Sequence, residues 1–202
     1  MRGEVSILRL IAAITAFVLL ASGPALAVAP MTAATVKAAQ DYGRKRAEYP
    51  LAVFLQPWTV FEERAARLDD TAERACLYTP FLLVAADARD RTAAGGTVGT
   101  ADGEKVLADY EGYVIFGVTL VGSREDFTGR YVATLRQGRK SVRPGLVHAP
   151  PPPADGGEAP CRVLVYFYFP AREVAAARPA TLKVATAGGR QRSFVFRFGD
   201  FR

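Results

Sequence analysis

The residues of this chain that could do chemistry are few, and its single histidine is the first of them. His148 carries the only imidazole among 202 residues, so a Ser-His-acid triad or a Cys-His pair would have to use it. The serines beyond position 27 do not stand in the glycine-flanked context of a nucleophile elbow: Ser123, Ser141 and Ser193. His148 itself lies two residues before a run of four prolines, where a rigidly held general base would be unusual. We therefore predict no catalytic residue and no cofactor, and expect His148 to be a solvated loop residue.

Metal-binding patterns are also absent from the sequence. It contains no His-Glu-x-x-His, no Cys-x-x-Cys, and no loop with acidic residues at alternate positions. The acidic clusters Asp102-Gly103-Glu104 and Glu125-Asp126 are typical of turns, where short acidic side chains accept backbone hydrogen bonds. We predict no metal site, with a single calcium ion held by loop oxygens as the open alternative.

Carboxylates alone can catalyse hydrolysis, because a glycosidase needs only two acids at a suitable separation. Candidates for such a pair are scattered along the chain: Asp109, Glu111, Asp126 and Glu173. The sequence does not show which of them meet in the fold, so an extracytoplasmic carboxylate-dependent hydrolase stays an alternative. A phosphate-binding loop is not expected, since the glycines at positions 95–99 follow a predicted helix instead of joining a strand to one.

One basic stretch is the only functional hint with a definite location. Its five basic residues fall within 14 positions that contain no acid: Arg130, Arg136, Arg139, Lys140 and Arg143. At a hairpin tip they would form a cationic edge able to bind an anionic envelope polymer or an acidic protein. The same charges would also protect an edge strand from pairing with other chains, and we favour this second interpretation. Nucleic acid is not an expected partner, because the stretch lacks the aromatic and basic interleaving of RNA-binding modules.

The first 27 residues have the order of a secretory signal peptide. Arg2 and Arg9 supply positive charge, an apolar run follows, and Ala25-Leu26-Ala27 forms a small-x-small cleavage site. The apolar run is about 12 residues long, whereas a membrane-spanning helix needs about 20. We expect cleavage after Ala27, an extracytoplasmic location and no membrane span after cleavage; an uncleaved anchor is the alternative. Cleavage would change the net charge from +6 to +5, since it removes two arginines and one glutamate.

Two cysteines, Cys76 and Cys161, lie in the exported part of the chain. In an oxidising compartment, two otherwise unexplained thiols are candidates to pair. A disulfide between them would close a loop of roughly 85 residues and stabilise the protein by about 4 kcal/mol in the chain-entropy model. Two buried free thiols are the alternative, since cysteine often serves as a small core residue.

Hydrophobic periodicity predicts a helix-rich part over residues 28–104. Three segments are predicted as helices: residues 31–48, 60–75 and 81–94. The second has Phe61, Ala65, Leu68 and Ala72 at helical spacing, and a split at residues 69–71 is its alternative. Thr32 is the expected cap of the first, and Thr79-Pro80 is a start signal for the third, whose first residues have a strand as their alternative. The segments between them are predicted as extended or loop: a buried strand over 51–55, an extended segment over 75–78, and a loop over 95–104.

From residue 105 the pattern changes to short strands. Alternate residues of the segment 113–121 share one apolar face: Val114, Phe116, Val118 and Leu120. Further strands are predicted over residues 130–136, 140–142, 163–169, 182–186 and 193–198. Because no helical crossovers separate them, we predict an α+β protein in which a helical N-terminal part precedes an antiparallel, immunoglobulin-like β-sandwich over residues 105–202.

Together these expectations describe an exported protein without catalytic machinery. We interpret it as a noncatalytic binding or envelope-assembly module whose partner is an anionic envelope polymer or another exported protein. A structural subunit of an exported complex is a further alternative, which an exposed apolar patch or an unpaired edge strand would favour.

Overall fold

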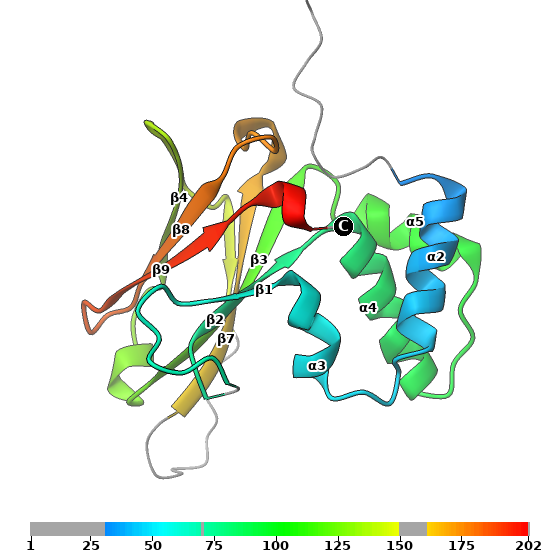
Figure 1. Ribbon diagram of the computed structural model, residues 1–202, viewed down its shortest axis with the longest axis horizontal. Helices are drawn as coiled ribbons and strands as arrows, with labels where there is room; N and C mark the ends of the chain where they lie inside the picture. Colours follow the sequence, from blue (N-terminus) through cyan, green and yellow to red (C-terminus); the bar gives the residue numbers. More distant parts are fainter. Residues whose placement is uncertain (1–30, 70, 150–160, 202) are drawn as a thin grey trace, which may run out of the picture.

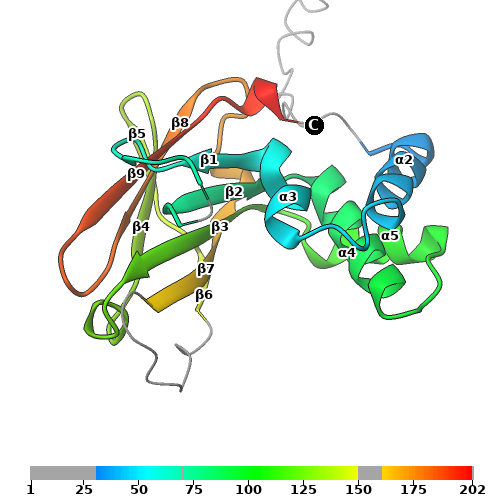
Figure 2. The same ribbon diagram turned by 60° about the horizontal axis from the view of Figure 1, so that its bottom comes forward.

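The computed structural model describes residues 31–69, 71–149 and 161–201. They form three layers: a four-stranded sheet, a five-stranded sheet and a group of helices (Figure 1). The five-stranded sheet lies between the other two layers (Figure 2), because one of its faces meets the second sheet and the other meets the helices. The predicted α+β class with a sheet-rich part is confirmed.

Both sheets are antiparallel throughout the described residues. The larger sheet has the order β1 (Thr59–Phe61), β2 (Arg74–Tyr78), β3 (Tyr113–Gly122), β7 (Cys161–Pro170) and β6 (Leu146–His148). The smaller sheet has the order β5 (Lys140–Val142), β4 (Val132–Gln137), β8 (Ala180–Ala185) and β9 (Gln191–Phe196). Two strands of the larger sheet, β1 and β2, come from before residue 105, so the helix-rich and strand-rich parts of the sequence share one sheet.

The facing sides of the two sheets form the main hydrophobic core. The alternate residues of β3 point into it as the period of two predicts, and Phe194 and Phe196 of β9 enter it from the other sheet. The rings of Phe116 and Phe196 meet with centroids 4.8 Å apart. A slip of one residue in either strand would turn these rings to the opposite face, so burial specifies the register.

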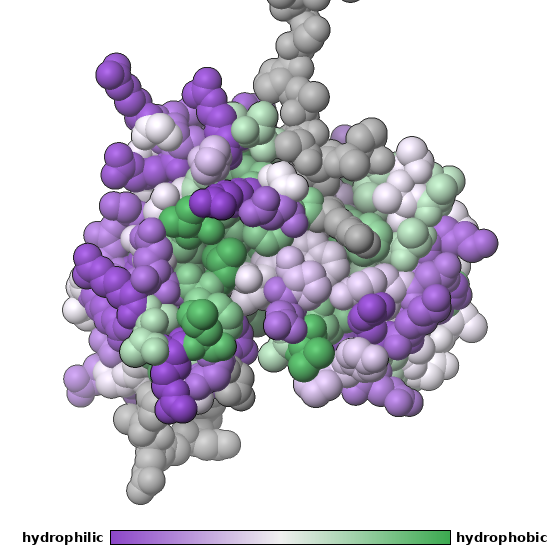
Figure 3. Space-filling view, in the orientation of Figure 1, coloured by the Kyte–Doolittle hydropathy of each residue, from purple (hydrophilic) through white to green (hydrophobic). Residues whose placement is uncertain are grey.

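The described α-helices are α2 (Ala33–Arg44), α3 (Leu51–Leu55), α4 (Pro80–Ala93) and α5 (Thr100–Asp109). Two of them begin as predicted: the N–H of Thr35 donates to Thr32 Oγ1 and the N–H of Leu82 to Thr79 Oγ1, both at 3.2 Å. A second apolar cluster joins the helices to the outer face of β2 through Cys76. On the face shown in Figure 3, hydrophilic residues cover the outer ends of both parts and apolar residues gather nearer their junction.

The strand predicted over residues 51–55 is wrong, because this segment is the short helix α3. The N–H of Phe54 donates to the carbonyl of Pro50 at 3.0 Å, and Phe54 is the buried residue of the helix. A run of five apolar residues has no period that separates a helix from a strand, so only its neighbours decide between them.

The helix predicted over residues 60–75 is also wrong. Its ends belong to β1 and β2, which pair with each other, and Leu68 from the expected buried stripe is 71% exposed. Between the strands, the N–H of Thr71 donates to Asp69 Oδ1 at 2.9 Å in a turn. Pairing with β3 buries Ala75 and Leu77, which outweighs the helical spacing of this segment.

The loop predicted over residues 95–104 ends early, because α5 begins at Thr100. The N–H of Gly99 donates to Asp102 Oδ2 at 2.8 Å, and the side chain of Gln40 donates to the carbonyl of Gly99 at 2.7 Å. Asp102 stands three residues after Gly99, as in a capping box, and this was the signal available in the sequence.

The predicted disulfide is absent, since Cys76 and Cys161 are both free thiols. Cys76 lies opposite Gly117, and Gly117 lies opposite Tyr166. The two cysteines are therefore two strands apart across the sheet and offset by five residues along it, since Tyr166 and Cys161 are both on β7. That amounts to about 10 Å across the sheet and about 16 Å along it, far beyond the span of about 7 Å that a disulfide allows. They also occupy opposite faces, because Cys76 joins the cluster under the helices and Cys161 packs on the sandwich core.

Candidate functional site

Two adjoining cavities lie where α4 and α5 meet the five-stranded sheet. Each has a volume of about 510 Å³, and they share Tyr78, Leu83 and Tyr110. We call the pair the tyrosine cleft, since five of the eight tyrosines line it: Tyr78, Tyr110, Tyr113, Tyr166 and Tyr168. Small-molecule sites usually have volumes of about 300–1,000 Å³, and both cavities fall in this range.

The first cavity, which we call the apolar chamber, lies at the end of the sandwich where β2 passes into α4. Its apolar lining comes from both parts of the fold: Leu77, Val114, Val174, Phe198, Leu83 and Leu107. Glu111 is the one charged residue among its described lining residues. Apolar surface removed from water in such a chamber contributes roughly 25 cal/mol per Å² to binding.

The second cavity, which we call the polar chamber, lies between α4, α5 and the outer face of the sheet. Asp87 and Asp90 reach it from α4, Asp109 from α5 and His148 from β6. The imidazole of His148 stacks on Tyr166 with ring centroids 6.3 Å apart. His148 is solvent-exposed, as expected, but it belongs to a strand and not to a loop.

The tyrosines of β7 lie on one face because side chains alternate along a strand. Gly117 on the neighbouring strand β3 leaves room for the rings of Tyr78 from β2 and Tyr166 from β7 to meet. Tyr166 and Tyr168 are two residues apart and point away from the sandwich core. On the intervening strand, a Cβ at Gly117 would lie 2.8 Å from Cε2 of Tyr78 and 3.2 Å from Cε1 of Tyr166. Because that Cβ is missing, the rings of Tyr78 and Tyr166 meet edge to face with centroids 5.7 Å apart.

The phenol groups of Tyr78 and Tyr168 remain protonated. Burial raises the pKa of Tyr78 far above its usual value of 10.0, and the nearby Cys76 and Tyr166 raise it further. Burial also raises the pKa of Tyr168, with smaller contributions from Tyr110 and Tyr166. Both hydroxyls therefore keep their protons at neutral pH; that of Tyr78 is hydrogen-bonded to Tyr166, and that of Tyr168 can donate to a ligand.

Each aspartate of the polar chamber is bonded through one oxygen to a basic side chain outside the lining. The contacts are Arg91 Nε to Asp87 Oδ2 at 2.8 Å, Arg89 Nη1 to Asp90 Oδ1 at 2.7 Å, and Lys105 Nζ to Asp109 Oδ2 at 2.6 Å. Each contact uses one carboxylate oxygen, so each aspartate keeps further acceptor capacity for a ligand. The arrangement suits binding better than acid catalysis.

The carboxylates considered for hydrolysis do not gather in one place. Asp109 and Glu111 line the cleft, but in different chambers. Asp126 lies beyond the other end of β3, where hydrogen bonds from Ser123 lower its pKa. Glu173 belongs to the 3₁₀ turn η4 (Ala171–Glu173).

The predicted basic residues are all exposed, and four of them surround the hairpin of β4 and β5. Gly138, with φ of 61°, turns the chain between the strands, and β5 is an edge of its sheet. Arg136, Arg139, Lys140 and Arg143 lie at or next to this hairpin, and Lys140 Nζ donates to the carbonyl of Glu173 at 2.7 Å. Arg130 precedes the other end of β4, about 20 Å along the strand from Arg136.

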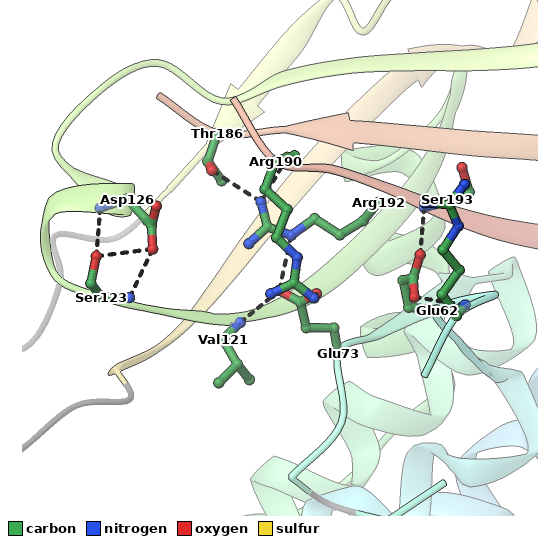
Figure 4. A network of polar contacts seen from close by, with 10 residues as sticks. Glu62, Glu73, Val121, Ser123, Asp126, Thr186, Arg190, Arg192 and Ser193 are labelled. Carbon is green, nitrogen blue, oxygen red and sulfur yellow. Dashed lines mark hydrogen bonds and ion pairs between the residues drawn. The ribbon is translucent and has the colours of Figure 1, made fainter. Parts of the chain in front are cut away.

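The sequence patterns did not predict a buried ionic network that the structure shows (Figure 4). Arg192, only 1% exposed, donates from Nε to Glu73 Oε1 at 2.9 Å and from Nη1 to Thr186 Oγ1 at 3.0 Å. Glu73 also accepts the N–H of Val121 at 3.0 Å and pairs with Arg190 at 3.0 Å. The alternation of β9 hinted at an inward side chain at position 192, but its partner lies 119 residues away. We assign this network to holding the two sheets together.

The Cys76 thiol is buried under the helices and unreactive. Burial raises the pKa of the Cys76 thiol from its usual 9.0 to about 12, so it is not a nucleophile at neutral pH. Within residues 31–69, 71–149 and 161–201, no three His, Cys, Asp or Glu side chains are grouped to hold a metal ion. None of the helices in these ranges is both long enough and apolar enough to cross a bilayer.

Comparison with known proteins adds no assignment, since no family model, curated protein or solved structure matches the chain.

Proposed function

We propose that the protein is an exported, noncatalytic binding module and that the tyrosine cleft holds its ligand. The supporting observation is the junction of the two chambers at Tyr78, Leu83 and Tyr110, because apolar walls with a few polar groups are typical of ligand sites. Export is supported by the sequence of residues 1–27, which lie outside the described residues. A mature N-terminus at Val28 in the extracytoplasmic fraction is the expected result, and a retained residue 1 would contradict it.

Filling the apolar chamber tests the binding role. Ala108 is exposed and lines this chamber, so Ala108→Trp should occupy it without disturbing the core. Ala101 is exposed on the same helix outside both chambers, so Ala101→Trp is a matched control. Binding of the neutral apolar dye N-phenyl-1-naphthylamine, followed by fluorescence, should fall more than tenfold in the first variant only. Equal dye binding by both variants would refute the cleft as the site.

A second candidate function, a subunit of an exported complex, is favoured by the edge strand β6. Its residues Leu146 and Val147 are 52% and 37% exposed, and no described strand pairs with its outer edge. The other three edge strands are protected. Basic residues flank β5, and the edges β1 and β9 of the two sheets meet next to a hydrogen bond from the N–H of Glu63 to the carbonyl of Ser193 at 3.0 Å. An open, uncharged edge can accept a strand from another chain.

A lysine on the edge tests this second candidate. Val147→Lys should prevent strand addition, whereas Val195→Lys is a control because Val195 is a similarly exposed valine, 39% exposed, on β9. Native electrophoresis of envelope extracts should show a high-mass species that only Val147→Lys loses. A wild-type protein that runs solely as a monomer would contradict the subunit role.

Two finer interpretations belong to this proposal. The immunoglobulin-like topology of the sandwich stays a prediction, supported by two antiparallel sheets with a common core. A carboxylate-dependent hydrolase is the less favoured alternative, because a lysine pairs with Asp109 and the other candidate acids are dispersed.

A further inference from the structure

We infer that the ligand of the tyrosine cleft is a cationic amphiphile, an apolar chain that carries a primary ammonium head. This inference rests on the proposed function and adds the chemical class of the ligand. The two chambers adjoin but differ in lining. A ligand that fills both must itself have an apolar part and a polar part.

The apolar chamber suits the chain of such a ligand. Its walls come from the end of the sandwich and from the helices, and they offer aliphatic and aromatic surface at positions 77, 83, 107, 114, 174 and 198. Glu111 is the one charged residue in the described lining of this chamber, so a buried ionised head would lack a full set of polar partners there, which costs several kcal/mol. A head group therefore belongs in the other chamber, on the far side of Tyr78 and Tyr110.

The charges of the cleft specify the sign of the head. The chain as a whole has a net charge of +6, yet the charged lining residues of both chambers are acidic: Asp87, Asp90, Asp109 and Glu111. No lysine or arginine is among the described lining residues, so an anionic head would meet carboxylates and phenols there, with the imidazole of His148 as the one basic side chain. The basic partners of the three aspartates, Arg89, Arg91 and Lys105, lie outside the lining, so a head group inside the cleft faces the carboxylates and not these cations.

The hydrogen-bonding groups of the polar chamber match an ammonium group. The contacts to basic side chains engage Oδ2 of Asp87, Oδ1 of Asp90 and Oδ2 of Asp109, and an ionised carboxylate has about four acceptor sites. An ammonium group offers three N–H donors to the remaining capacity. Tyr166 and Tyr168 line the same chamber, and a cation placed over the face of either ring within about 6 Å of its centroid would gain cation–π attraction.

Three decyl compounds separate the head groups while the chain stays constant. Decylammonium, decyl maltoside and decyl sulfate, each below its micelle concentration, compete with N-phenyl-1-naphthylamine for the purified protein. We expect decylammonium to bind at least tenfold more tightly than either of the others. Equal or tighter binding of the maltoside or the sulfate would overturn the inference.

Paired variants test whether the acids cause this preference. Asp90→Asn with Asp109→Asn removes two exposed carboxylates of the chamber, whereas Glu48→Gln with Glu104→Gln removes two exposed carboxylates elsewhere. The first pair should weaken decylammonium binding at least fivefold and leave dye binding unchanged; the second pair should change neither. If the wild type binds the dye in an Ala108→Trp-sensitive way but shows no preference for decylammonium, or if the first pair leaves decylammonium binding unchanged, only the cationic ligand is refuted. If the wild type does not bind the dye, the proposed function is refuted as well.

Discussion

At the scale of single residues, Arg192 shows how burial changes the meaning of a charge. The sequence contains 26 lysines and arginines, most of them typical of a solvated surface, yet Arg192 is among the most buried side chains of the protein. A charge in such a place is tolerated only with a full set of partners, which Glu73 and Thr186 supply.

Removal of that charge should destabilise the protein strongly. Arg192→Met leaves the buried carboxylate of Glu73 with one remaining ionic partner, so we expect a loss of about 3 kcal/mol in the free energy of unfolding. Arg190 contacts the same carboxylate but is 62% exposed, so Arg190→Met should cost less than about 1 kcal/mol. Urea unfolding measures both losses. If they were equal, the burial of Arg192 would not explain its contribution to stability.

The buried thiol of Cys76 predicts a pH dependence of stability. Its pKa rises from 9.0 to about 12 in the folded protein, so between these values the unfolded chain releases a proton that the folded chain keeps. Stability from this group is complete below pH 9 and is lost as the pH rises towards 12. Urea unfolding at pH 8 and pH 10 should show a larger fall for the wild type than for Cys76→Ala. Cys161→Ala is the control, and it should behave like the wild type.

At the scale of elements, β3, the middle strand of the larger sheet, determines how closely two tyrosine rings of the cleft approach each other. Gly117 of β3 lies between the rings of Tyr78 and Tyr166, and its missing side chain lets them touch. In sequence, this glycine interrupts a run of β-branched and aromatic residues. Only the two neighbouring strands show why a residue without a side chain is needed there.

A methyl group at this position should disturb the cleft. Gly117→Ala places its Cβ 2.8 Å from a ring atom of Tyr78, so a ring must move, and we expect a loss of about 1–3 kcal/mol in stability together with weaker dye binding. Gly145 precedes β6, and a Cβ there would lie 3.9 Å from Pro170, an ordinary contact. Gly145→Ala should therefore leave stability and dye binding unchanged. Identical behaviour of the two variants would refute the spacing role of Gly117.

At the scale of the whole molecule, two charged regions are separate in the fold. The tyrosine cleft is lined by acids, whereas four of the five predicted basic residues surround the β4–β5 hairpin of the other sheet. An anionic envelope polymer would therefore bind at the hairpin and not in the cleft.

The basic hairpin has two interpretations that one experiment separates. If it binds an anionic polymer, replacing Arg136, Arg139, Lys140 and Arg143 together by glutamine should release the protein from the envelope fraction. If it protects the edge of β5, the same variant should aggregate while its fractionation stays unchanged. Arg130→Gln is the control, because this residue lies beyond the opposite end of β4. Unchanged fractionation would exclude the binding role.

Sequence alone determined the features that depend on local physics. The α+β class, the caps at Thr32 and Thr79, and the inward face of β3 follow from backbone hydrogen bonding and from the period of two, which act over a few residues. Tertiary structure decided the secondary structure of residues 51–55 and 60–75 and the separation of the two thiols. It also placed His148 in one chamber with acids from α4 and α5. These outcomes depend on which strands pair and which faces become buried. Such contacts join residues far apart in the chain, and no local pattern encodes them.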